Sequence, residues 1–389
     1  MANSLLQNQV YTIINAINAQ VKGGGTTQAV DSSSFVTVAQ TALLTGYDNL
    51  MNAVSQVLSD TIFSHRPYEA ILDILYNDSI RWGNHVRKIV PLDDNAERDD
   101  RLPLTDGQSV DPWIVNKPKV KQFNFYGQEV FQRHKSIPKD QIDTAFSNEN
   151  EFARFVAMIY AHANDQITQD RENLARLALG NFIAGKTLTD TAGVIHLLTE
   201  YNAQTGLSLT AQTVYQPANY AAFIRWASAR IMSVSDDLRN RGYRYHKNLT
   251  GVNIPRHTGR EYQRFIMFAP AYRQVEASTL ATTWHDDYIK GFDAFEAVNF
   301  FQNPDDPATV KVTPAIIDND GEFVQGAETT VSNIFGMIFD RDAVGMTSIN
   351  QWSSATPLNP RGGYSNMFWH YTLRYYNDFT ENSALFLLN

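Results

Sequence analysis

One segment of the sequence, GNFIAGKT at residues 180–187, has the residue types and spacing of a nucleotide-binding motif. Gly180, Gly185, Lys186 and Thr187 satisfy the pattern G-x-x-x-x-G-K-[ST] of phosphate-binding loops. In such a loop the backbone amides surround the phosphates, and the lysine contacts the terminal phosphates. The motif raises the hypothesis of a nucleotide hydrolase that uses Lys186.

The sequence around GNFIAGKT favours a structural role for this segment. A phosphate-binding loop follows a buried strand and opens a helix, whereas this segment follows a long helical pattern and precedes a turn-rich stretch. Its middle residues, Phe182, Ile183 and Ala184, are apolar and suit packing. We therefore predict that Gly180 and Gly185 end the helix and form the turn after it, with Lys186 as a surface or interface cation.

Two polar clusters contain residue types that could bind a metal or act as catalytic carboxylates, but the spacing of neither cluster favours such a site. His285, Asp286 and Asp287 are adjacent, and neighbouring side chains on a strand point to opposite faces, so a solvated turn is favoured over a metal site. Residues 340–342, Asp-Arg-Asp, resemble a charged strand end and have no accompanying histidine. The chain has no cysteine, which excludes disulfides and thiolate sites. We predict no catalytic residue, no cofactor and no metal.

The composition indicates a globular protein of more than one packed unit. The chain has 389 residues, of which 43% are hydrophobic and 19% are charged. Its net charge of -9 disfavours a protein that grips nucleic acid by neutralising phosphates. No apolar run approaches the roughly 20 residues of a membrane span, and the first residues lack the pattern of a signal peptide.

Residues 87–125 predict a long two-stranded hairpin. Val86, Ile89 and Val90 are strand-like, residues 93–101 are almost all polar or charged, and a return strand follows around Phe123 and Phe125. Such a hairpin has too small a core to be stable alone, so we expect it to rest on a surface outside its own chain.

The hairpin also contains the residues that we predict to form a subunit interface. They are Arg98, Asp99, Asp100, Arg101, Trp113, Lys117, Lys119 and Lys121. The alternation of basic and aromatic residues is also compatible with a surface that binds nucleic acid. The acidic total charge favours docking on an acidic neighbouring surface instead.

The remaining patterns predict an α+β protein with one very long helix. Asn148 and Glu151 suit a capping box, and helical spacing then continues to Gly180, about 48 Å at ~1.5 Å per residue. Shorter amphipathic helices are predicted near residues 6–21 and 47–58. A further long helix is predicted over 218–239, with an inward face of Tyr220, Phe223, Ile224, Ala227, Ile231, Val234 and Leu238. From Arg260 onward the pattern is typical of strands.

The order of these elements resembles the major capsid proteins of tailed bacteriophages. These proteins have the Hong Kong 97-like capsid fold, which encapsulins and the herpesvirus capsid floor share. The sequence similarity is greatest in residues 334–345, IFGMIFDRDAVG, and in the segment from Tyr364 to Leu385, which includes RYYND and ENSAL. The resemblance in the order of elements extends over nearly the whole chain, whereas the resemblance in amino-acid sequence is limited to the last sixty or so residues.

The resemblance implies a division into named parts. Residues 1–86 would form an N-terminal arm, residues 87–125 an extended loop lying on an adjacent subunit, and residues 126–215 a peripheral domain with a spine helix at 148–180. Residues 216–335 would form the axial domain, and residues 336–389 a C-terminal β segment returning to the core. Some relatives link a loop lysine to an asparagine of a neighbour, and that pairing is not matched in this sequence.

The resemblance also implies the function and the partners. The chain would be a non-enzymatic capsid subunit that assembles as hexamers and pentamers of an icosahedral shell around double-stranded DNA, without sequence-specific binding. Scaffolding, portal or decoration proteins would be partners, no membrane would be involved, and assembly would take place in the host cytoplasm before the protein enters the virion. Two alternatives stay open, an encapsulin-like compartment and the nucleotide hydrolase.

Overall fold

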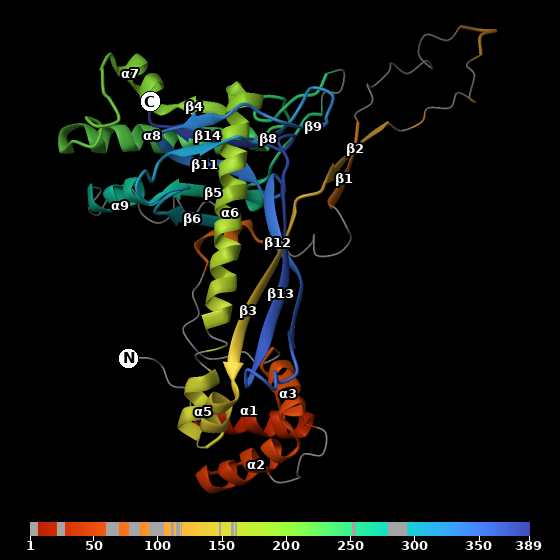
Figure 1. Ribbon diagram of the computed structural model, residues 1–389. Helices are drawn as coiled ribbons and strands as arrows, with labels where there is room; N and C mark the ends of the chain where they lie inside the picture. The colour runs from red at the N-terminus through yellow and green to blue at the C-terminus, as the bar shows by residue number, and fades with distance from the viewer. Residues whose placement is uncertain are drawn as a thin grey trace. The chain divides into compact units, whose positions relative to one another are not determined.

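The computed structural model describes residues 7–21, 28–59, 70–77, 86–92, 105–109, 113, 117, 119–147, 149–156, 159, 162–250, 254–278 and 294–389. The chain divides into two compact units, which are described separately below. Unit 1 comprises Met1–Asp73, Gln128–Leu174 and Met346–Arg374, and unit 2 comprises Ile74–Gly127, Ala175–Gly345 and Tyr375–Asn389. Figure 1 labels the helices and strands of both units.

Unit 1 contains a cluster of short helices. They are α1 (Gln7–Gln20), α2 (Ser32–Leu44), α3 (Tyr47–Ser59), α4 (Lys139–Ala145) and α5 (Glu149–Val156). The apolar stripe of α1, which includes Ile13 and Ile17, is buried, and α1 lies against α2 and α3. The stripe has no partner close by in the sequence, and α2 and α3 supply the surface that covers it.

A three-stranded sheet completes unit 1. Its strand order is β12 (Val344–Ala355), β13 (Tyr364–Asn377), β3 (Gln128–Pro138), and β13 pairs with β3 in antiparallel register from Tyr364↔Pro138 to Arg374↔Gln128. Met367, Trp369 and Tyr371 are buried while the residues between them are half-buried, as a sheet with one covered face requires. Asp170 on α6 (His162–Thr189) accepts hydrogen bonds from Arg133 of β3 and from the hydroxyl of Tyr371.

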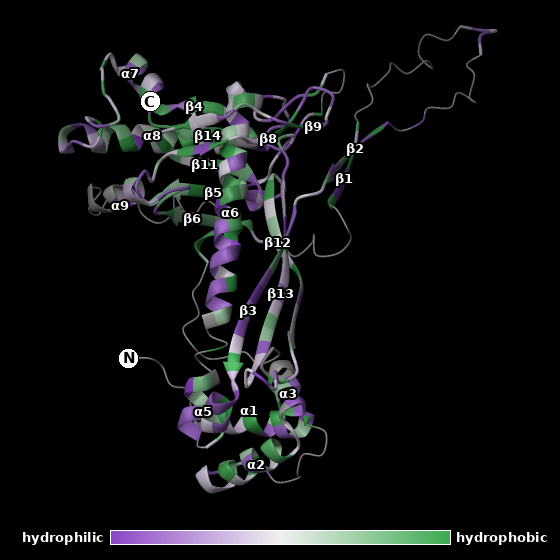
Figure 2. Cartoon of the chain, in the orientation of Figure 1, coloured by the Kyte–Doolittle hydropathy of each residue, from purple (hydrophilic) through white to green (hydrophobic). Residues whose placement is uncertain are grey.

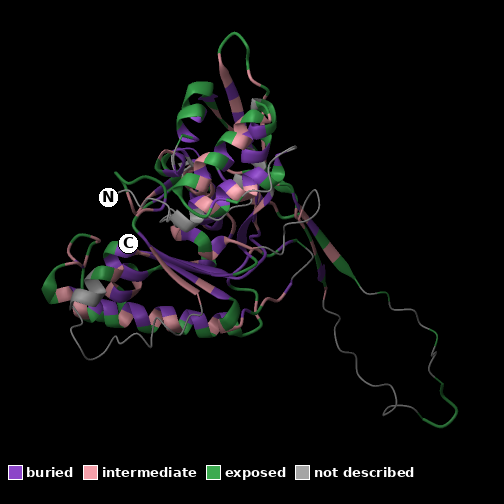
Figure 3. Cartoon of the chain, turned by 90° about the horizontal axis from the view of Figure 1, so that it is seen from below, coloured by how far each residue is buried: buried purple, intermediate pink, exposed green. Residues whose placement is uncertain are grey.

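Unit 2 is built on a five-stranded mixed sheet. The strand order is β4 (Val194–His196), β14 (Ser383–Leu387), β11 (Ile334–Asp340), β5 (Gln263–Phe268), β6 (Ala294–Val298). β11 is antiparallel to both β14 and β5, whereas β4 and β6 run parallel to their neighbours. Every residue of β11 and β14 is buried, as Figure 3 shows for the strands near the C-terminus.

Helix α8 (Pro217–Arg239) packs on this sheet and forms the main core of unit 2. The sequence predicted its inward face correctly, and all seven predicted residues are buried: Tyr220, Phe223, Ile224, Ala227, Ile231, Val234 and Leu238. They lie with strand residues such as Phe265, Phe335 and Phe386 in one cluster. A helix with 3.6 residues per turn that covers a flat apolar sheet has one buried face, and the sequence pattern reflects that geometry.

Shorter elements complete the described part of unit 2. They are the 3-10 turns η4 (Thr191–Gly193) and η5 (Arg260–Tyr262), the helices α7 (Leu197–Thr205) and α9 (Ala269–Ser278), and the strands β7 (Val310–Val312), β8 (Ala315–Ile317), β9 (Phe323–Gln325) and β10 (Thr329–Val331). β8 pairs with β9 and β10 with β7. A further 3-10 segment, η1 (Ile71–Leu75), crosses from unit 1 into unit 2.

The predicted spine helix at 148–180 differs from the observed one at both ends. Helix α5 ends at Val156, and α6 begins at His162 and continues to Thr189, so the helix passes straight through Gly180 and Gly185. Asn148, the predicted cap, lies outside the described residues. In Figure 2 the first half of α6 is mostly hydrophilic, while its second half carries hydrophobic residues. The division into arm, loop, peripheral and axial parts stays a prediction.

Candidate assembly interface

The predicted hairpin is present, and its two strands have distinct faces. Strand β1 (Val86–Pro91) pairs with β2 (Val120–Phe125) in antiparallel register, with Lys88 opposite Phe123. Because directly paired residues point to the same face, the hairpin root has an inward face and an outward face. The inward face consists of Val86, Lys88, Val90, Lys121, Phe123 and Phe125, and the outward face of Arg87, Ile89, Pro91, Val120, Gln122 and Asn124.

The inward face of β2 is held to unit 2 by aromatic packing. Phe123 and Phe125 are buried, and the Phe125 ring lies 5.3 Å from Phe323 and 5.7 Å from Tyr376 between centroids. The Lys121 ammonium donates a hydrogen bond to the backbone carbonyl of Asp320 at 2.9 Å. The sequence expected the hairpin to rest outside its own chain, but the described root rests on its own unit.

The outward face of the root is largely exposed, and it carries apolar side chains beside the polar Arg87, Gln122 and Asn124. Ile89 is 54% exposed and Val120 is 59% exposed, and Tyr126, just after β2, is 69% exposed. Val120 pairs with Pro91, so these groups are neighbours on one face. The exposed Ile89 and Val120 side chains are available for contact with another protein.

The predicted interface residues fall into three groups. Arg98, Asp99, Asp100 and Arg101 lie outside the described residues. Trp113, which is 84% exposed, and Lys117 and Lys119 are on the surface of the segment between β1 and β2. Lys121 is half-buried at the root. Their role as subunit contacts stays a prediction.

A group of four charged side chains lies where β1 meets the turn after β13. The Lys88 ammonium is 2.5 Å from a carboxylate oxygen of Asp378 and also forms an ion pair with Glu381. Arg256 lies 3.2 Å from Glu381 and donates a hydrogen bond to the carbonyl of Thr380 at 3.0 Å. Below, Lys88, Arg256, Asp378 and Glu381 are called the root cluster.

Burial and ion pairing shift the pKa values of the root cluster in opposite directions. Burial alone would raise the pKa of Asp378, but Lys88 and hydrogen bonds from Thr380 outweigh it and hold that pKa below its usual value. Burial raises the pKa of Glu381 despite the nearby Lys88. Burial also opposes the charge on Lys88, and the two carboxylates more than compensate, so the pKa of Lys88 is raised.

The sequence analysis did not find the root cluster. In the sequence, Lys88 is one of several basic residues near the hairpin, and Asp378 and Glu381 belong to the RYYND and ENSAL segments that carry the family resemblance. A usable signal was the alternation in β1, which places Lys88 on the same face as Val86 and Val90. A lysine on an apolar face is expected to have a carboxylate partner.

Residues 340–342 form the charged strand end that the sequence predicted. Asp340 ends β11, is buried, and accepts hydrogen bonds from the Thr258 hydroxyl at 2.7 Å and the Asp342 amide at 2.9 Å. Burial raises the pKa of Asp340. Asp342 is exposed, so the two carboxylates occupy different environments in a turn.

The GNFIAGKT segment is not a phosphate-binding loop in this structure. It lies in the last turns of α6, where the backbone amides are used by the helix itself. A helix C-terminus carries partial negative charge, whereas phosphates bind at helix N-termini. The predicted buried character of Phe182, Ile183 and Ala184 is confirmed.

Two parts of the sequence interpretation of this segment were wrong. Gly180 and Gly185 neither end the helix nor form a turn, because both lie within α6. A Cβ at Gly185 would lie 2.4 Å from the Phe379 ring, so this glycine permits close packing. Lys186 is 1% exposed, pairs with Asp190, and donates a hydrogen bond to the carbonyl of Tyr245 at 2.8 Å, so it is not a surface cation.

Replacing Gly180 with alanine tests this placement. A Cβ there meets only Val310, at 3.4 Å, which is an ordinary contact. Alanine is favoured over glycine inside a helix, so we expect Gly180→Ala to raise the free energy of unfolding by about 0.5–1 kcal/mol. Urea denaturation followed by circular dichroism measures the change, and a clear loss of stability would contradict a helix through Gly180.

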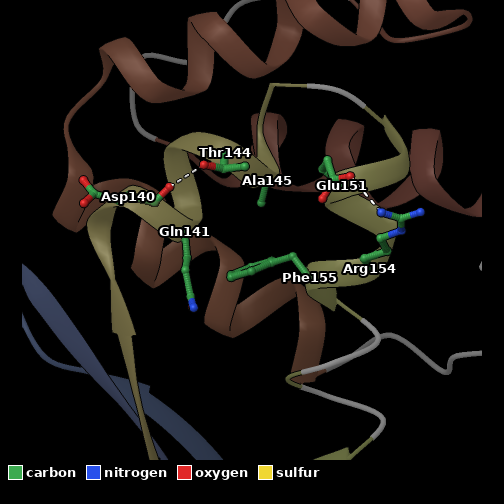
Figure 4. A pocket seen from close by; sticks show the side chains of 7 residues that line it. All are labelled: Asp140, Gln141, Thr144, Ala145, Glu151, Arg154 and Phe155. Carbon is green, nitrogen blue, oxygen red and sulfur yellow. Dashed lines mark hydrogen bonds and ion pairs between the residues drawn. The ribbon is translucent and has the colours of Figure 1, made fainter.

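Several depressions lie on the surface of the described residues. The one in Figure 4 has a volume of about 350 Å³ and lies between α4 and α5. Among the residues that line it, Arg154 pairs with Glu151 at 3.0 Å and the Thr144 hydroxyl donates a hydrogen bond to the carbonyl of Asp140.

The sequence predicts neither a metal site nor a membrane-spanning helix, and the described residues show the following. No group of three potential metal ligands occurs among them, and residues 285–287 lie outside them. None of their helices is long and apolar enough to span a bilayer.

Comparisons with known proteins identify the family. The model of the Phi29-like phage major capsid protein family matches residues 12–387. A search of curated proteins finds no match. Among solved structures, the chain is similar to one from the capsid of Staphylococcus phage Andhra, with 9% identity, a TM-score of 0.54, and coverage of 85% of this chain and 87% of that chain.

A second structure shows the same fold. It is a chain from the structure of the head fiber and inner core protein gp22 of native bacteriophage P68, with 11% identity, a TM-score of 0.54 and the same two coverages, 85% and 87%. The match of mixed helices and sheets to phage capsid structures confirms the predicted α+β class, and the Hong Kong 97-like label stays a prediction. It favours neither a protein compartment nor a nucleotide hydrolase. Because the family model spans most of its length, the chain belongs to the Phi29-like phage major capsid protein family.

Proposed function

We propose that this protein forms the icosahedral shell of a double-stranded DNA phage, with the β1–β2 hairpin of each copy lying on a neighbouring copy. The observation that carries the proposal is the exposed outward face of the hairpin root, where the apolar Ile89 and Val120 are more than half exposed, in a member of a capsid family. In a closed shell every copy presents the same surface, so a neighbour is always available to cover this face.

The finer organisation follows from the family resemblance and forms part of the same proposal. Residues 1–86 act as an N-terminal arm, 87–125 as the extended loop, 126–215 as a peripheral domain, 216–335 as an axial domain, and 336–389 as a C-terminal β segment of a Hong Kong 97-like fold. Copies assemble as hexamers and pentamers in the host cytoplasm. Scaffolding, portal and decoration proteins are the proposed further partners, and the shell confines DNA without sequence-specific contacts or catalysis.

Deleting the tip of the hairpin tests the proposal. Removal of residues 94–110 leaves β1, β2 and the root cluster in place, so the subunit is expected to fold. Because each subunit contacts several neighbours at once, the loss of one contact type is multiplied around the shell. We therefore expect few closed shells of normal size by electron microscopy, with unchanged circular dichroism.

A variant of equal length serves as the control. In this variant a Gly/Ser segment of equal length replaces residues 94–110. The loop keeps its length but loses its side chains, so the variant separates the effect of loop length from the effect of specific side-chain contacts. Normal shells from the deletion variant would exclude the proposed role of the hairpin.

A further inference from the structure

Strands β1 and β2 belong to unit 2, and they contact the rest of that unit through different kinds of side chain. β2 carries the buried Phe123 and Phe125 and contributes the aromatic contacts described above. β1 contributes three inward side chains, of which Val86 is half-buried, Val90 is buried, and Lys88 reaches the root cluster. The polar connection from β1 to the turn after β13 is therefore made by Lys88.

The segment that receives Lys88 is rigidly built. The second oxygen of the Asp378 carboxylate accepts hydrogen bonds from the Thr380 amide at 2.9 Å and the Thr380 hydroxyl at 2.6 Å. The amide of Asp378 donates to the carbonyl of Ala343 at 2.7 Å, and the amide of Asp340 donates to the carbonyl of Asn382 at 2.9 Å. The turn thus presents its carboxylates in a fixed position beside β11.

The charges of the root cluster balance only when Lys88 is present. Two cations, Lys88 and Arg256, face two carboxylates, and the Asp378 side chain is fully buried. Without Lys88, Glu381 would keep its ion pair with Arg256, whereas the buried Asp378 carboxylate would keep its hydrogen bonds from Thr380 but lose its cation, which is strongly unfavourable. Release of Lys88 from this site is accordingly costly, and β1 is held in one position.

We infer that Lys88 is the positioning residue of the hairpin: it fastens β1 to the Asp378–Glu381 turn and so sets the direction in which the hairpin leaves unit 2. The inference rests on the proposed role of the hairpin in assembly. A subunit whose hairpin is free to pivot presents its outward face in many directions, and a closed shell requires one direction.

Three variants and one control separate positioning from plain stability. Lys88→Met removes the ammonium, and Lys88→Arg retains a cation. The double variant Lys88→Met/Asp378→Asn removes one charge of each sign and keeps an oxygen that accepts from Thr380, so it leaves no extra buried charge and is expected to fold. Lys119→Met is the matched control for hydrogen exchange in the unassembled subunit, because Lys119 is an exposed lysine of the same hairpin outside the root cluster.

Hydrogen exchange on unassembled subunits is the first measurement. In the double variant we expect amides of β1 and β2 to exchange at least about tenfold faster, while β5, β11 and β14 keep the wild-type rate. Lys88→Arg and Lys119→Met are expected to stay close to wild type. The second measurement is the yield of closed shells by electron microscopy, which should fall at least about tenfold in the double variant and recover in Lys88→Arg.

Two outcomes overturn the inference. One is wild-type exchange of β1 and β2 in the double variant, and the other is a normal yield of shells despite faster exchange. Both differ from a failure of the proposed function, since the tip deletion leaves Lys88 and its partners intact. If the tip deletion assembles normally while the double variant still shows faster exchange of β1 and β2, the proposed function fails and the anchoring by Lys88 stands.

Discussion

Replacing Lys186 with alanine is expected to lower the free energy of unfolding by about 3–5 kcal/mol. The side chain is 1% exposed, and its ammonium pairs with Asp190 and donates to the Tyr245 carbonyl at 2.8 Å. Its loss leaves a buried carboxylate and a buried carbonyl without their cation. Denaturant unfolding followed by circular dichroism measures the change.

Matched variants identify the cause of the loss. Lys311 also pairs with a carboxylate, Glu328 at 3.3 Å, but its side chain is 61% exposed, so Lys311→Ala should cost at most about 1 kcal/mol. Lys186→Met/Asp190→Asn removes both charges together and should recover much of the stability. A Lys186→Ala variant of unchanged stability that has lost a nucleotide hydrolase activity of the wild type would return the phosphate-loop hypothesis.

The pH dependence of Lys186 provides a separate check. Burial lowers the pKa of Lys186 to about 8, against 10.5 for an ordinary lysine, while Asp190 opposes the shift. Between these values the unfolded chain binds more protons than the folded one, so stability from this group rises with pH. The wild type should therefore gain stability relative to Lys186→Met between about pH 8 and 10.5, and a constant difference would contradict a buried Lys186.

Phe379→Ala is the second change with a large expected effect, about 3–5 kcal/mol of lost stability. The Phe379 side chain is 1% exposed, and its ring stacks on Phe182 at 5.0 Å with an interplanar angle of 11°. The same ring occupies the space beside Gly185, where a Cβ would lie 2.4 Å away. Truncation therefore opens a cavity beside the last turns of α6.

A double-mutant cycle with Gly185 tests this geometry. Gly185→Ala alone should cost about 1–3 kcal/mol, because the methyl group overlaps the Phe379 ring. In the Phe379→Ala background that cost should disappear, since the ring is gone and alanine suits a helix. Strictly additive effects of the two substitutions would show that Gly185 and Phe379 are not in contact.

Elements with strong local patterns were predicted well. The inward face of α8, the strand at β11 and the hairpin of β1 and β2 were all predicted from the spacing of apolar residues. Each pattern arises because an element that covers one surface must place apolar side chains at its own period. Such information lies within a few consecutive residues, so it can be extracted without knowing the partner.

The end of α6 was predicted wrongly because glycine has two structural roles. Glycine commonly follows the last turn of a helix, and the sequence analysis assigned that role to Gly180 and Gly185. Here Gly185 instead allows Phe379 to approach the helix, and Phe379 is far away in the sequence. No local pattern distinguishes the two roles, since the deciding contact belongs to the tertiary structure.

The sequence by itself determined the family resemblance, the mixed α and β composition, the core face of α8 and the presence of the hairpin. The tertiary structure alone decided that Lys186 is buried and that Lys88 belongs to a four-charge cluster. The reason is that the energy of a buried charge depends on partners brought together by folding, and Lys88 and Asp378 are separated by 290 residues. GNFIAGKT matches the sequence pattern of a phosphate-binding loop, but it lies at the C-terminal end of α6, where its side chains pack in the protein interior.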